Sequence, residues 1–280
     1  MALAETKPSQ RDGWVFCLFT YIIRALIEPW ERIGMRNLVK ILLAACLFLS
    51  AASVFAHDEP EEEEVVKPWE GSGELGFVNT TGNTETVALN AKLNFIRTGK
   101  KWRHRFSGTA MTTSEDGNKD NERYTMEVQS DRKLTEKSWL FGAFRWDADK
   151  FGSYDPQVSL TAGYGYQLMK SEKHSLKGEI GAGYRKLEET STNNTSSEAI
   201  ARFLLDDSWQ VFKSTAWTNR LLIETGSSNT FTQFNTALAV SMNARFALKL
   251  GFEARNNTKI PPGDTEKTDT ITSANLVYNF

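Results

Sequence analysis

The chain has 280 residues, with 33 basic and 35 acidic side chains, a formal net charge of −2 and two cysteines. Such balanced charge excludes the broad positive field with which proteins recruit nucleic acid. Both cysteines, Cys17 and Cys46, lie in the first 56 residues. The rest of the chain therefore cannot form a disulfide framework, a thiolate metal site or a cysteine nucleophile.

A secretory signal peptide is predicted at residues 35–56. Arg36 and Lys40 supply its basic start, residues 41–49 its apolar core, and a small-residue site that ends at Ala56 its cleavage point. This pattern predicts export of the chain and removal of the leader.

Residues 1–34 do not fit the signal pattern, and their apolar stretch is too short to span a bilayer comfortably. We interpret them as an upstream, mis-assigned translation start or as an unstructured extension. Cys46 follows a sequence that resembles a lipoprotein cleavage box, but the apolar run continues beyond it, so we assign it to the signal core. Residues 57–68 are rich in acidic side chains and are predicted to be a disordered periplasmic tail.

From residue 69 onward, stretches of alternating apolar and polar residues are separated by turn residues. A period of two places the two sets on opposite faces of a strand. In residues 156–169, Val158, Leu160 and Ala162 alternate with Ser159 and Thr161. We predict strands near 70–79, 84–97, 102–114, 121–134, 138–151, 156–169, 175–189, 196–210, 214–225, 230–243, 246–256 and 266–280.

These strands predict an all-β protein, most simply a transmembrane antiparallel up-and-down β-barrel of 12 strands over residues 69–280. A water-soluble sandwich or lipocalin-like barrel is the alternative. The predicted strands reach the roughly 9–11 residues needed to cross a bilayer and exceed the roughly 5–6 residues of ordinary soluble strands. Their polar faces carry charges and glycines, which suit a hydrated lumen. The membrane barrel is therefore favoured.

The connections support an even number of strands. Membrane barrels of this kind have short periplasmic turns and longer outer loops. Turns at 99–101, 135–137, 170–173 and 243–245 are compact, and connections at 115–121, 190–195 and 257–265 are longer and more polar.

The last strand ends in an aromatic residue after alternating apolar positions: Leu276, Tyr278 and Phe280. This ending resembles the terminal strand of bacterial outer-membrane barrels, which the assembly machinery reads. We therefore expect outer-membrane lipid, the barrel assembly machinery and periplasmic chaperones as partners.

Aromatic residues are expected at both membrane interfaces. The predicted periplasmic set is Phe95, Trp102, Trp139, Trp209, Trp217, Phe246 and Phe280, and the predicted outer set is Phe77, Tyr124, Trp146, Tyr184 and Phe231.

The opening strand and its turn carry a family resemblance. Residues 71–86, with Thr81, Gly82, Asn83 and Thr84 as the turn, resemble the start of the YdiY-like family of salt-induced outer-membrane proteins. The resemblance runs from about residue 69 to residue 280. It implies an outer-membrane barrel linked to salt or osmotic conditions, and it implies no catalytic residues and no substrate.

Strand alternation also predicts the charged lining of the lumen. The candidate pore-lining residues are Arg103, Arg105, Arg123, Arg145, Arg185, Arg202, Arg220, Arg255, Glu127, Glu179 and Glu253. They can form interior ion pairs that fill a closed structural or partner-binding barrel. They can also line a narrow pore for small ions, acidic sugars or other polar solutes.

An outer-membrane lipid-modifying enzyme is the third and least favoured hypothesis. His57 lies at the predicted cleavage point, His174 in a turn, and His104 on the parity that faces away from the lumen. No histidine is placed as a general base beside a luminal nucleophile. We expect no catalytic residues, no cofactor and no metal site.

Overall fold

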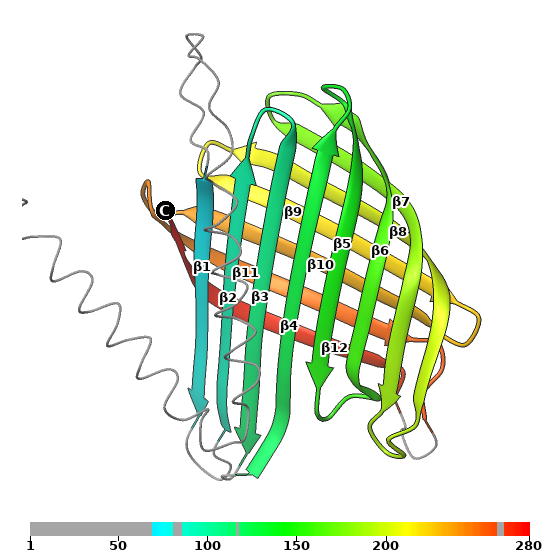
Figure 1. Ribbon diagram of the computed structural model, residues 1–280. Helices are drawn as coiled ribbons and strands as arrows, with labels where there is room; N and C mark the ends of the chain where they lie inside the picture. The colour runs from blue at the N-terminus through cyan, green and yellow to red at the C-terminus, as the bar shows by residue number, and fades with distance from the viewer. Residues whose placement is uncertain (1–68, 81–85, 116–117, 262–265) are drawn as a thin grey trace, which may run out of the picture. The chain divides into compact units, whose positions relative to one another are not determined.

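The structure is a computed structural model that describes residues 69–80, 86–115, 118–261 and 266–280. Twelve strands pair in chain order and β1 closes on β12, which gives a closed antiparallel barrel (Figure 1). The strands are β1 (Trp69–Thr80), β2 (Thr86–Thr98), β3 (Trp102–Glu115), β4 (Asn118–Lys133), β5 (Ser138–Asp149), β6 (Tyr154–Lys170), β7 (His174–Glu189), β8 (Thr195–Phe212), β9 (Thr215–Gly226), β10 (Thr230–Ser241), β11 (Phe246–Asn257) and β12 (Thr268–Asn279).

The fold prediction is confirmed, and the predicted strands match the observed ones within a few residues. The predicted upstream segment, signal peptide with Ala56, acidic tail and turn at 81–84 lie outside the described residues. Among the described residues, no helix is long and apolar enough to span a membrane.

Side chains are sorted by the parity of each strand. On β6, Leu160 faces outward and is 65% exposed, whereas its neighbours Ser159 and Thr161 face inward and are buried. Large exposed apolar residues recur around the barrel, such as Leu75 on β1 and Leu250 on β11. An apolar outside and a charged inside are stable when the outer surface faces lipid. The barrel therefore has the surface of a membrane-spanning protein.

Two of the predicted rim aromatics face the other way. Trp139 and Phe231 lie at strand ends but point into the barrel, where they are 5% and 1% exposed. The reason is parity: Trp139 shares the inward face of β5 with Arg145, and Phe231 shares that of β10 with Gln233. Their assignment to the membrane interfaces is wrong.

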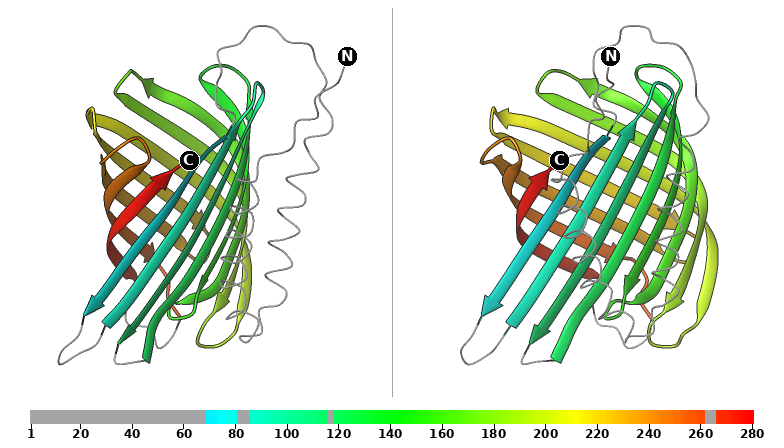
Figure 2. Two further views of the ribbon diagram at one scale, coloured as in Figure 1. Left: turned by 90° about the vertical axis from the view of Figure 1, so that its left-hand side faces the viewer. Right: turned by 60° about the vertical axis from the view of Figure 1, so that its left-hand side comes forward.

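The interior is packed unevenly. The inward faces of β5–β8, which we call the packed side, are mostly buried and include the apolar residues Phe141, Leu187 and Leu204. The inward faces of β2 and β3, which we call the accessible side, carry no fully buried residue among those described. The inward side chains of β2 and β3 are therefore less completely buried than those of the packed side, and Figure 2 shows these strands next to β1.

Candidate functional site

Glu179 is the centre of a buried polar cluster on the packed side. Its Oε1 accepts hydrogen bonds from Arg105 Nη2, Gln129 Nε2 and Trp139 Nε1 at 3.1, 2.9 and 3.2 Å. Its Oε2 accepts one from Arg202 Nη1 at 2.9 Å. These donors come from four different strands, so one carboxylate on β7 ties together β3, β4, β5 and β8.

Trp139 occupies its inward position because the neighbouring strand leaves room for it. A Cβ built on Gly165 of β6 would overlap the indole ring. The Arg103 guanidinium lies over the Trp139 ring, 5.2 Å from its centroid. Arg103 also pairs with Asp131 at 2.7 Å, so the indole and this ion pair lie in contact on the luminal face.

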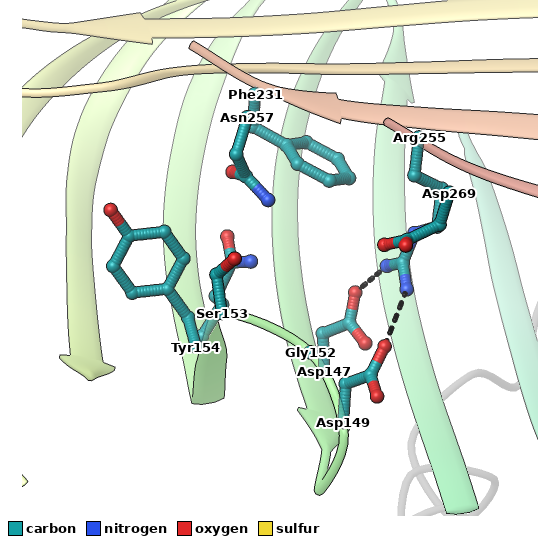
Figure 3. A pocket seen from close by; sticks show the side chains of 10 residues that line it. Asp147, Asp149, Gly152, Ser153, Tyr154, Phe231, Arg255, Asn257 and Asp269 are labelled. Carbon is teal, nitrogen blue, oxygen red and sulfur yellow. Dashed lines mark hydrogen bonds and ion pairs between the residues drawn. The ribbon is translucent and has the colours of Figure 1, made fainter. Parts of the chain in front are cut away.

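A second cluster closes the outer end of the packed side. Arg255 on β11 pairs with Asp147 and lies 3.9 Å from Asp149, both on β5 (Figure 3). The guanidinium groups of Arg145 and Arg255 lie 4.4 and 5.3 Å from the centroid of the Phe231 ring. A cavity of about 10 Å³ remains here, which is about the size of one water molecule.

Arg220 and Glu127 form a bridge across the lumen at mid-barrel. Arg220 Nη2 of β9 donates to Glu127 Oε1 of β4 at 2.6 Å. Their side chains remain 31% and 23% exposed, in contrast to 2% for both Glu179 and Arg202. This pair is therefore accessible to water in the middle of the barrel.

The candidate pore-lining residues fall into two sets by exposure. All of them point inward, as strand parity predicts. The partly exposed set is Arg103, Arg105, Arg220, Glu127 and Glu253, and the buried set is Arg123, Arg145, Arg185, Arg202, Arg255 and Glu179. Only the first set can meet a solute directly, and pore lining itself stays a prediction.

The described histidines lie on the outer surface near the periplasmic end. His104 Nδ1 is 2.9 Å from Ser130 Oγ, and His104 stacks on Trp102. His174 Nε2 is 2.5 Å from Asp207 Oδ1. No group of three or more potential metal ligands occurs within the described ranges.

Sequence reasoning missed Gln129, Trp139 and Phe231 as parts of the luminal clusters. Parity alone could have found them, since each alternates in phase with a charged residue that was assigned to the lumen. Their partners are on distant strands and could not be read from spacing.

The predicted assembly residues lie together at the periplasmic end. Leu276, Tyr278 and Phe280 point outward, and the Phe280 ring lies 5.9 Å from Tyr278 and 5.6 Å from Phe95. They form an aromatic patch at the end of the chain. Recognition of these residues by the assembly machinery stays a prediction.

The chain is similar to several known proteins. The "Uncharacterized protein YdiY" of Escherichia coli is 29% identical over 246 residues, covering 86% of this chain and 96% of that protein. Among solved structures, an outer membrane channel (COG4313) from Pseudomonas putida F1 is similar with a TM-score of 0.47 and 12% identity, over 80% of this chain and 100% of the other. The NanC porin is similar with a TM-score of 0.43 and 8% identity, over 75% and 97%.

A family model matches residues 73–280, which include nearly all of the barrel. The sequence-based resemblance to YdiY-like proteins is thereby confirmed. The chain belongs to the family described as "Protein of unknown function, DUF481".

Proposed function

We propose that this protein is an outer-membrane β-barrel that acts as a narrow diffusion channel for small polar solutes. The observation that carries the proposal is the partial exposure of Arg220 and Glu127 in the middle of the lumen. In a sealed interior we would expect this pair to be as little exposed as Glu179 and Arg202, whose side chains are 2% exposed. Water that reaches this level gives small solutes a path along the accessible side.

The exposed charges define the solute class. Arg103, Arg105 and Arg220 offer guanidinium groups that suit small anions and acidic sugars. Glu127 and Glu253 lie in the same space, so the expected ion selectivity is weak. The outer-membrane location is supported by the lipid-facing surface and by the aromatic C-terminal strand.

The test is single-channel conductance of the refolded chain 57–280 in a planar bilayer. We expect discrete openings, and Arg220→Ala should raise the conductance because it removes a cross-lumen bridge. Arg132→Ala is the matched control, since Arg132 lies on the outward face of β4. Folding is checked by the gel-mobility difference between unheated and boiled samples. A folded barrel that stays silent, together with its Arg220→Ala variant, would overturn the channel.

A closed structural or partner-binding barrel is the second candidate function. It is favoured by the bridges between opposite walls, such as Arg255 to Asp147 and Arg123 to Glu253. The link to salt or osmotic conditions rests on the family resemblance and belongs to either candidate. Growth of a deletion strain across a range of salt concentrations would test that link: unchanged growth would remove it.

A further inference from the structure

The barrel is incompletely paired at one seam. β1 pairs with β12 through four residue pairs, from Ser72↔Asn279 to Leu75↔Leu276. On its other side β1 pairs with β2 along its whole length, up to Thr80↔Thr86. In Figure 1, β1 and β12 meet beside the C-terminus and diverge away from it. The half of this seam nearer the outer end therefore lacks the ladder that the other seams have.

A hollow of about 80 Å³ lies at the unpaired half of the seam. Its lining includes Ala88, Met111 and Ile271 from the inward face, and Phe77 and Ala274 from the outward face. Residues of both faces line this hollow, so it lies within the barrel wall. In a bilayer, unpaired strand edges are unfavourable unless something covers them, and water is absent there.

The luminal side of this hollow has no charged residue among those described, unlike the rest of the interior. Ala88, Met111 and Ile271 line it beside the uncharged polar residues Thr113 and Ser273. Asn90 and Asn275 line the edge of the hollow toward the charged lumen, where Asn90 Nδ2 donates to Asn275 Oδ1 at 3.0 Å. Such a chamber favours a hydrocarbon chain over an ion.

Lys92 lies directly beyond this polar boundary. It is on the same face of β2 as Asn90, two residues further toward the periplasm, which is about 7 Å. Glu74, its neighbour across the strand pair, is bound by Lys249 at 2.8 and 3.0 Å. Lys92 is attracted by the same carboxylate from across the strand pair. Lys92, Lys249 and Glu74 together therefore carry one net positive charge, which can bind an anion.

From this arrangement we propose that the β1–β12 seam is a lateral binding site for a long-chain carboxylate from the bilayer. Lys92 binds the carboxylate, the hollow holds the methylene groups nearest to it, and the remainder of the chain passes between the strands into lipid. The ligand covers the unpaired strand edges with apolar surface. This site is separate from the polar path, and its occupant is a lipid-like carboxylate rather than a polar solute.

The experiment uses palmitate with a diazirine near its carboxylate end, added to the refolded chain 57–280 in phosphatidylcholine vesicles. After irradiation, mass spectrometry maps the labelled residues. We expect labelling at the inward-facing Met111, which bulk lipid does not reach. Because a charge-assisted hydrogen bond is lost, Lys92→Gln should reduce this labelling about tenfold, and Lys92→Arg should retain it.

Two further variants complete the test. Lys177→Gln is the matched control, since Lys177 is also an inward-facing lysine but lies on β7; labelling at Met111 should not change. Ala88→Phe should fill the hollow and abolish labelling while Lys92 is intact. Labelling confined to outward residues such as Phe77 would overturn the proposal. So would labelling of Met111 in Lys92→Gln that equals its labelling in the unmodified protein.

Discussion

Phe280 closes the barrel against Gly71. The two residues exchange backbone hydrogen bonds of 3.1 Å (Gly71 N to Phe280 O) and 3.0 Å (Phe280 N to Gly71 O). The Phe280 ring covers the place where a side chain on Gly71 would be, because a Cβ built there would overlap the ring. The C-terminal aromatic is therefore seated on the first strand, at the one end of the β1–β12 seam that is fully paired.

Gly71→Val should displace the Phe280 ring and weaken closure of the barrel. Forcing a side chain into such a contact destabilises by about 1–3 kcal/mol. The measurement is the fraction of heat-modifiable, folded barrel after refolding into vesicles. Gly73→Val is the matched control: it lies on the same face of the same strand, and a Cβ there meets no atom within 4 Å. Equal folding of the two variants would show that the ring does not depend on the glycine.

Glu179→Gln should be strongly destabilising. It removes the negative charge that pairs with Arg105 and Arg202 in a buried site, and leaving buried charges uncompensated costs roughly 3–5 kcal/mol. The measurement is urea unfolding in lipid vesicles. Asp206→Asn is the control, because this carboxylate is 33% exposed and 3.8 Å from Arg220, so the loss should stay below about 1 kcal/mol. Similar losses for both would contradict the central role of Glu179.

Strand alternation was sufficient to predict the number of strands, their approximate bounds and the inward placement of the arginines. The reason is physical: a period of two is local, and lipid on one side enforces it on every strand. Trp139 and Phe231 were misplaced because their position at strand ends was given more weight than their parity.

The contacts between opposite walls could not be predicted. Arg220 and Glu127 are 93 residues apart in sequence, and their meeting depends on how far successive strands are staggered around the barrel. The same holds for the short β1–β12 ladder. Parity gives the face of each residue but not its height along the barrel axis, so neither the Glu179 cluster nor the unpaired half of the seam follows from the sequence.

Phe231→Leu should destabilise the barrel by about 2 kcal/mol. The substitution keeps an apolar side chain next to Leu204 and Leu222 but removes the ring faces over which Arg145 and Arg255 lie, and such cation–π contacts stabilise by about 0.5–2 kcal/mol each. Phe234→Leu on the outward face of β10 is the matched control, with little expected change. Urea midpoints in vesicles compare them: equal midpoints would argue against a role for the inward ring.

Arg220→Glu should turn the weak selectivity of the channel toward cations. The substitution places a further carboxylate beside Glu127 and Asp206 at the water-accessible middle of the lumen. A negative constriction attracts cations and repels anions. The measurement is the reversal potential in a potassium chloride gradient, which should shift toward the potassium equilibrium potential.

Lys213→Glu is the control for this last change, because it makes the same change in net charge in the exposed turn between β8 and β9. Its reversal potential should stay close to that of the unmodified barrel. Equal shifts in the two variants would assign the effect to surface charge at the channel mouth. No shift in Arg220→Glu, in a barrel that still conducts, would mean that ions pass the mid-barrel level without meeting the Arg220–Glu127 pair.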